Sequence, residues 1–393
     1  MSVSSSLPPL DEASRAHSER VSLHLRQHIA TAGGWIPFDQ FMTQALYAPG
    51  LGYYAAGSHK LAGAADTAGS GDFITAPELT PLFARALAGP VAAILRASGS
   101  TEVLEFGAGT GALAAGLIEA LQDQGIAVHY RILEVSADLR ERQQARLAAH
   151  GEQVQWLDAL PDSFRGCVLA NEVLDAMPVR LFHWHEDGLM ERGVICRNAA
   201  AGETPFAWED RPAPAELAHT VGERMPTLPG YTSEINFQAE AFIREMGRWL
   251  HAGAALLIDY GFPRHEYYHP QRTEGTLMCH LRHTAHADPL ICPGVQDITA
   301  HVDFTAMADA ALEGGLDVYG YTSQARFLVN AGLGQWLQAL HEQSPQAYAR
   351  SLGAVQKLVS EAEMGELFKV LAVGRGMNDA PPGFEPGDRL GML

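Results

Sequence analysis

The chain contains a glycine-rich turn, Gly107-Ala108-Gly109-Thr110-Gly111, between a short apolar run and a segment of helical character. Glycine permits a sharp turn and a close backbone approach to a ligand, which a side chain would obstruct. The helix that follows would offer unpaired N–H groups to a polar or negative ligand. We therefore predict that Gly107, Gly109 and Gly111 bind a cofactor; a tight turn without any ligand is the alternative.

Two acidic residues follow this turn at positions suited to nucleoside recognition. Glu134 ends a second strand-like run, where a carboxylate can accept hydrogen bonds from ribose hydroxyls. Asp158 ends a third such run and is placed to accept a hydrogen bond from an adenine amino group. The glycine spacing is G-x-G-x-G, unlike the G-x-G-x-x-G of dinucleotide-binding turns. We predict cofactor contacts for both acids, with solvated strand-end carboxylates as the alternative.

A polar group, Asn171, Glu172 and Asp175, follows the fourth strand-like run. Ligands of open parallel sheets bind outside the carboxyl ends of the strands, so these residues are the catalytic candidates. A first helical turn would place Glu172 and Asp175 on neighbouring faces, from which both could reach a cation. The alternative is helix capping by Asn171 or Asp175.

Histidines crowd the segment 269–286. His280 and His283 could share a helix face and bind a metal, which would favour a zinc hydrolase, but the segment has no paired-ligand spacing. We favour histidines that shape a pocket and expect no metal. His283, and Tyr54 after a turn-rich stretch, are the candidate substrate contacts.

Apolar runs alternate with amphipathic segments in the spacing of a parallel sheet. The strand-like runs are 102–106, 128–134, 153–157, 166–170, 254–258 and 366–373, and the helical segments are 14–32, 80–97, 111–122, 137–149 and 238–250. This pattern predicts an α/β fold with helices on both faces of the sheet.

The amino-acid composition narrows the range of possible partners and cellular locations. The 393 residues are 47% hydrophobic and 19% charged, with a net charge of −19, which disfavours nucleic acid as a partner and mildly favours a cationic one. No apolar run is long enough to span a membrane, and the first residues resemble neither a secretory signal nor a transit peptide. Four cysteines without a C-x-x-C pair fit a reducing compartment, so we expect a cytoplasmic protein.

With these residues in view, the chain resembles the MidA-like SAM-dependent methyltransferases. The resemblance covers most of the chain from about Phe38 onward, and seven motifs carry it: Gly71–Glu78 (GDFITAPE), Leu104–Gly111 (LEFGAGTG), Leu133–Ser136 (LEVS), Asn171–Val179 (NEVLDAMPV), Leu257–Phe262 (LIDYGF), Gly294–Phe304 (GVQDITAHVDF) and Met364–Leu371 (MGELFKVL). Mitochondrial members of that family are arginine methyltransferases that assist the assembly of respiratory complex I.

The resemblance implies a class I methyltransferase fold: a Rossmann-like, mostly parallel seven-stranded sheet with an N-terminal helical segment and an inserted lobe. It implies S-adenosylmethionine (SAM) as methyl donor and S-adenosylhomocysteine as product. It also places Gly71, Thr75 and Pro77 over the cofactor, beside the glycine turn and Glu134.

We expect six regions along the chain. They are an N-terminal helical cap (1–98), a SAM-binding half (99–181), an inserted substrate lobe (182–235), a return to the core sheet (236–262), a lid or substrate wall (263–315), and C-terminal elements that complete the core (316–393). Three functions stay open: a protein arginine methyltransferase, a small-molecule methyltransferase, and a SAM-binding assembly protein with little catalysis.

Overall fold

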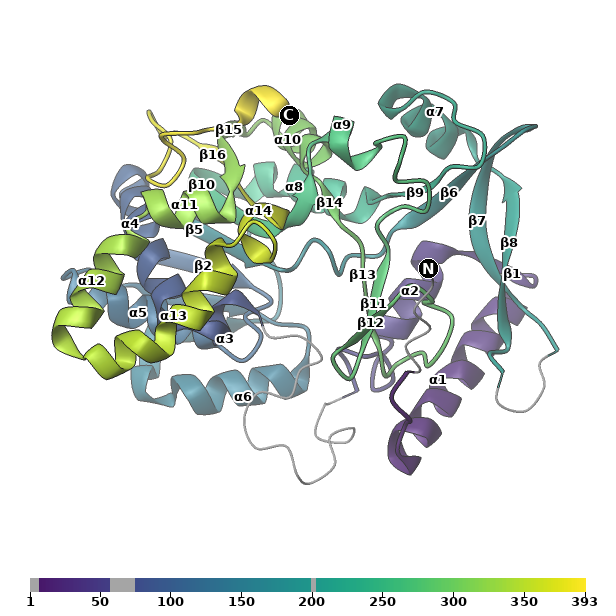
Figure 1. Ribbon diagram of the computed structural model, residues 1–393, viewed down its shortest axis with the longest axis horizontal. Helices are drawn as coiled ribbons and strands as arrows, with labels where there is room; N and C mark the ends of the chain where they lie inside the picture. Colours follow the sequence, from purple (N-terminus) through teal and green to yellow (C-terminus); the bar gives the residue numbers. More distant parts are fainter. Residues whose placement is uncertain (1–6, 57–74, 199–202) are drawn as a thin grey trace. The chain divides into compact units, whose positions relative to one another are not determined.

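The computed structural model describes residues 7–56, 75–198 and 203–393. The chain forms two compact units, each built from separate stretches of sequence (Figure 1). Unit 1 comprises Met1–Phe73, Ala176–Gln238 and His265–His301, and unit 2 comprises Ile74–Asp175, Ala239–Arg264 and Val302–Leu393. Among the described residues, no helix combines the length and the apolar character needed to cross a bilayer.

Unit 2 contains the predicted α/β sheet. Its strands are β2 (Glu102–Phe106), β3 (His129–Leu133), β4 (Val154–Leu157), β5 (Phe164–Asn171), β10 (Leu250–Phe262), β14 (Val302–Asp303), β15 (Asp317–Ser323) and β16 (Phe368–Arg375). They follow the order β15-β16-β10-β5-β2-β3-β4, and β14 pairs with β10. The pairs from β10 to β4 are parallel.

The sheet agrees with the prediction of a mostly parallel sheet but differs in one detail, because β14 adds an eighth strand beside the path of seven. Strand β16 lies between β10 and β15 and runs antiparallel to both. Nearly every residue of β16 is buried, as expected of a strand in the interior of a sheet. A continuous apolar run predicts such burial but carries no information on strand direction.

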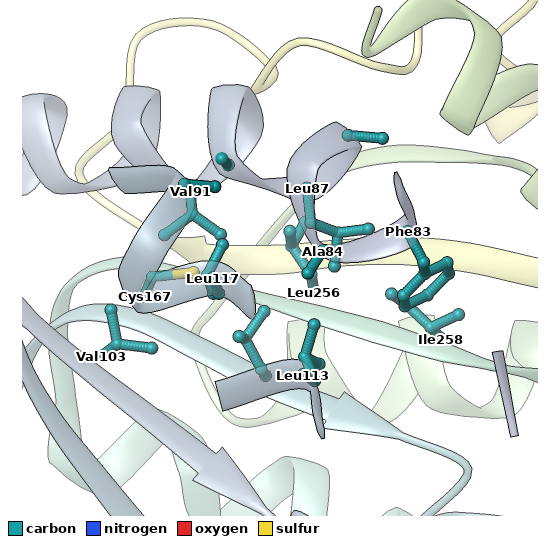
Figure 2. Close-up of a cluster of buried hydrophobic side chains, with 14 of the residues drawn as sticks. Phe83, Ala84, Leu87, Val91, Val103, Leu113, Leu117, Cys167, Leu256 and Ile258 are labelled. Carbon is teal, nitrogen blue, oxygen red and sulfur yellow. The ribbon is translucent and has the colours of Figure 1, made fainter. Parts of the chain in front are cut away.

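The helices of unit 2 are α3 (Ala76–Leu79), α4 (Pro81–Ser98), α5 (Ala112–Asp123), α6 (Ala137–Leu147), α8 (Phe237–Trp249), α10 (Phe304–Glu313), α11 (Gln324–Asn330), α12 (Leu333–Gln343), α13 (Pro345–Val359) and α14 (Met364–Leu367), with 3-10 turns at Ala148–Gln153 and Leu390–Met392. Figure 2 shows Leu87 of α4 and Leu117 of α5 in the buried cluster with Val103 of β2. Phe106, on the opposite face of β2, stacks edge-to-face on Phe242 of α8. Helices therefore cover both faces.

Unit 1 contains two antiparallel sheets. The larger has the order β1-β7-β6-β9 with β8 paired to β7, and the smaller has the order β12-β11-β13. The elements are α1 (Glu12–Thr31), β1 (Trp35–Pro37), α2 (Phe38–Tyr47), β6 (Arg180–His185), β7 (Gly188–Cys196), β8 (Phe206–Pro212), α7 (Ala215–Arg224), β9 (Thr232–Ile235), α9 (Arg264–Tyr267), β11 (Met278–Leu281), β12 (Thr284–His286) and β13 (Asp297–Thr299). A separate apolar core joins α1 and α2 to these sheets.

Candidate functional site

Three strands of unit 2, β2, β3 and β5, end together at one edge of its sheet, where the neighbouring β10 continues to Phe262. Phe106 of β2 pairs with Leu133 of β3 and with Ala170 of β5, and Asn171 pairs with Ile258 of β10. The strand order reverses between β2 and β5, and open α/β sheets bind ligands at such a point. Most residues predicted to bind cofactor or substrate lie in the segments that follow these strands.

The glycine turn connects β2 to α5 in a backbone conformation that suits glycine. Gly107, Gly109 and Gly111 have φ values of 59°, 55° and 82°, in the left-handed region that other residues rarely adopt. A β-carbon at Gly107 would lie 3.2 Å from Val173 Cγ2. At Gly109, apart from its chain neighbours, no atom of the described residues would lie within 4 Å of one. A ligand can therefore approach the Gly109 backbone closely.

Gln143, on α6, connects the glycine turn to Glu134. The fully buried Gln143 amide donates to the Gly109 carbonyl and to Glu134 Oε2, both at 2.9 Å, and accepts from Trp156 Nε1 at 3.0 Å. Burial raises the pKa of Glu134, while hydrogen bonds from Ser136 and Gln143 act against that rise. Sequence reasoning missed Gln143 because a polar residue in an amphipathic helix does not reveal whether it faces inward.

A second buried carboxylate lies in β2, just before the glycine turn. Glu105 is 3% exposed and accepts a hydrogen bond from the Tyr130 hydroxyl at 2.7 Å. Burial raises the pKa of Glu105 to about 7; the Tyr130 hydrogen bond lowers it, and the charge of Glu134 raises it. Glu105 thus titrates close to neutral pH.

Two of the three residues predicted to cover the cofactor lie at the short helix α3. Thr75 precedes α3 as its N-cap residue, and Pro77 lies in that helix. Their neighbour Glu78 forms a hydrogen bond with Thr110 of the glycine turn and an ion pair with Arg146 at 2.9 Å. The α3 segment is therefore tied to the turn through Glu78, which the sequence did not single out. Gly71 lies outside the described residues.

Asp158 follows β4 at the same edge of the sheet. It forms an ion pair with Arg140 of α6, and 84% of its side chain is exposed. Among the described residues, the hydrogen bond and ion pair of Asp158 are with Arg140 and not with the glycine turn, so its predicted role at an adenine group rests on its place after β4.

The loop after β5 differs from the expected helical turn. Residues 172–175 are not helical, and Glu172 has a φ of 54°. Such a conformation costs about 1–2 kcal/mol for a residue with a β-carbon and is concentrated at functional sites. The Glu172 N–H donates to the Ile258 carbonyl at 2.9 Å, and Asn171 Nδ2 donates to Glu172 Oε1 at 3.1 Å. The prediction of a first helical turn was therefore wrong, because these hydrogen bonds hold the backbone at Glu172 in a non-helical conformation.

Asp259 of β10 anchors this loop. It is 1% exposed, and its Oδ2 accepts hydrogen bonds from the N–H groups of Leu174, at 3.0 Å, and Asp175, at 3.2 Å. Burial, followed by the charges of Asp175 and Glu172, raises the pKa of Asp259 well above its usual range. The carboxyl groups of Glu172, Asp175 and Asp259 therefore form a cluster. It lies next to the glycine turn, because Val173 of the same loop approaches that turn.

The two predicted substrate contacts belong to unit 1. Tyr54 donates a hydrogen bond to Asp297 Oδ1 at 2.8 Å and stacks on Tyr47. His283 lies in the turn of the β11–β12 hairpin, where Arg282 and His283 both have positive φ, as in a type I′ turn. The hypothesis that His280 and His283 share a helix face is therefore wrong.

Comparison with known proteins identifies the family. Residues 86–322 match the family model described as "Putative S-adenosyl-L-methionine-dependent methyltransferase". The chain belongs to this methyltransferase family. It is similar to a Burkholderia thailandensis protein whose crystal structure contains S-adenosyl-homocysteine, at 49% identity and a TM-score of 0.91 over 99% of this chain and 100% of that one.

Two curated relatives have names that state an activity. Protein arginine methyltransferase NDUFAF7, mitochondrial, of Mus musculus is 29% identical over 89% of this chain and 83% of its own length. The Danio rerio protein of the same name is 27% identical over 91% and 88%. Both names specify mitochondria, whereas a cytoplasmic location for this chain stays a prediction.

The enzyme is thus a SAM-dependent methyltransferase with SAM as its cofactor, and the resemblance to the MidA-like family is confirmed. The site in unit 2 fits that cofactor chemically. The glycine turn exposes backbone at Gly109, and the Glu134 carboxylate follows the neighbouring strand.

Proposed function

We propose that the enzyme transfers a methyl group from SAM to an arginine side chain of a protein. The observation that carries the proposal is the carboxyl cluster of Glu172, Asp175 and Asp259 beside the glycine turn. The names of the relatives from Mus musculus and Danio rerio support it.

The chemistry of an arginine acceptor suits these residues. A guanidinium is always charged and presents N–H donors in a fixed plane, which carboxylates bind with charge-assisted hydrogen bonds. In the proposed complex, Glu172 and Asp175 hold the guanidinium and Asn171 orients Glu172 through its hydrogen bond. Asp259 keeps the loop in place through the Leu174 and Asp175 N–H groups.

SAM supplies a methyl group on a sulfonium, and displacement from it requires an in-line nucleophile, so alignment supplies much of the rate. We propose that the Gly107, Gly109 and Gly111 backbone holds the cofactor and that Glu134 accepts its ribose hydroxyls. Asp158 would contact the adenine, and Thr75 and Pro77 would cover the site. Tyr54 and His283 remain the proposed substrate contacts.

The test is a methyl-transfer assay on a cell extract divided into its protein and its low-molecular-weight fractions. The expected result is release of S-adenosylhomocysteine with the protein fraction, and methylarginine in that fraction by mass spectrometry. Release only with the low-molecular-weight fraction would identify a small-molecule methyltransferase instead. Cofactor binding without release in either fraction would favour an assembly protein. Glu172→Gln serves as the low-activity control.

A further inference from the structure

Two histidines and an aspartate converge on the larger sheet of unit 1, and none of them is among the residues proposed for methyl transfer. His183 and His185 are alternate residues of β6, so both side chains project from the same face. Asp210 comes from β8, and one potential ligand atom from each of the three residues lies within 4.8 Å of the others.

Hydrogen bonds and packing hold this cluster in place. His183 Nδ1 is 2.7 Å from the Thr232 hydroxyl oxygen, a contact that restricts the orientation of the imidazole, as hydrogen bonds to metal-ligating histidines do. The rings of His183 and His185 meet edge-to-face with centroids 5.2 Å apart. Arg192 of β7 donates to both oxygens of Asp210, at 2.8 and 2.9 Å, and so fixes the carboxylate.

We propose that His183, His185 and Asp210 bind one divalent transition-metal ion, for which zinc is the probe. Two imidazole nitrogens and a carboxylate oxygen form a ligand set typical of zinc, whereas magnesium and calcium prefer oxygen ligands alone. This site departs from the expectation of no metal. Its residues escaped notice because the HxH pair and Asp210 are far apart in sequence and meet only through strand pairing.

The geometry needs only a small adjustment. Ligand atoms about 2.1 Å from a tetrahedral zinc ion are about 3.4 Å apart, so atoms that now lie within 4.8 Å of one another must approach by at most about 1.4 Å. The exposed His185 can rotate to do this. The Asp210 carboxylate has about four lone-pair positions, so it can contact a metal while it still accepts hydrogen bonds from Arg192. A bound ion would join β6 to β8 across β7.

The test is calorimetry of zinc binding to untagged, metal-stripped protein, with a thermal melt of each sample. We expect one zinc ion per chain, a higher melting temperature with zinc, and at least a tenfold loss of affinity in His185→Ala and His183→Ala. His251→Ala, an exposed histidine of β10, is the matched control and should bind as wild type.

His185→Ala is the decisive variant, because the exposed side chain can be removed with little effect on folding. If the wild-type protein binds no zinc, or if His185→Ala binds it as tightly as wild type does, the proposal is overturned. Equal losses in His185→Ala and His251→Ala would indicate non-specific binding and would overturn it as well. Methyl transfer is not part of the readout, so the result is independent of the proposed function.

Discussion

Replacing Glu172 with glutamine should slow methyl transfer while leaving the fold and cofactor binding intact. The glutamine retains an oxygen that can accept the Asn171 hydrogen bond, and the backbone bond from residue 172 to Ile258 is unaffected. It also removes a negative charge that raises the pKa of Asp259. We therefore expect the fold to tolerate the substitution. Loss of one charge-assisted hydrogen bond to a guanidinium costs about 1.5–3 kcal/mol, which corresponds to a roughly 10- to 150-fold lower rate.

Glu172→Gly separates the functional role of this residue from a structural one. The left-handed φ of 54° at residue 172 costs about 1–2 kcal/mol for a side chain with a β-carbon and nothing for glycine. This relief offsets the lost side-chain interactions, so the stability of the variant should remain within about 1 kcal/mol of wild type. Its turnover should nevertheless be lower than that of Glu172→Gln, since glycine cannot contact substrate at all.

The assay combines three measurements on each variant: affinity for S-adenosylhomocysteine by calorimetry, melting temperature, and release of S-adenosylhomocysteine during turnover. Glu119→Gln, an exposed position of α5, controls for the change of charge in unit 2 and should behave as wild type. Unchanged turnover in both Glu172 variants would refute the role given to this carboxylate. Joint loss of cofactor affinity and stability would show instead that Glu172 is structural.

Three further outcomes are expected. Since the pKa of buried Glu105 rises from 4.5 to about 7, its contribution to stability is complete below pH 4.5 and is lost as pH rises through 7. Glu105→Gln can still accept the hydrogen bond from Tyr130 but cannot ionise. The variant should therefore lose less stability than wild type between pH 5 and pH 8, by up to about 3 kcal/mol at 1.36 kcal/mol per pKa unit. An unchanged pH profile in thermal melts would contradict this. Gln143→Leu leaves Glu134 Oε2 and the Gly109 carbonyl, both half-buried, without the donor that Gln143 supplies. The variant should be less stable by about 1–3 kcal/mol and should bind S-adenosylhomocysteine more weakly; calorimetry showing full affinity would exclude Gln143 as a positioning residue. Gly109→Ala should cost about 1–2 kcal/mol of stability through its positive φ and reduce cofactor affinity at least tenfold, and normal binding would mean that the turn does not contact the cofactor.

The parallel part of the sheet was predictable because its signals are local. The run predicted at 102–106 is β2, and the helix predicted at 111–122 is α5, found at Ala112–Asp123. Apolar runs bounded by turn residues and followed by amphipathic segments define each strand and helix separately. The left-handed turn between them follows from its glycines. In contrast, the prediction of a helical turn after β5 was wrong. The backbone there is held by the hydrogen bond from the Glu172 N–H to the Ile258 carbonyl, and that bond depends on which strand lies beside β5.

The sequence by itself determined the α/β class, the glycine turn with its neighbouring acids and, through motifs along most of the chain, the methyltransferase family. Only the tertiary structure decided the antiparallel course of β16, the Gln143 bridge between the turn and Glu134, and the attachment of the loop after β5 to Asp259. It alone also joined the HxH pair of β6 to an aspartate of β8. The physical reason is common to all four. Local patterns record which residues are buried, whereas contacts between distant segments depend on strand order, direction and register, which are settled only when the whole core packs.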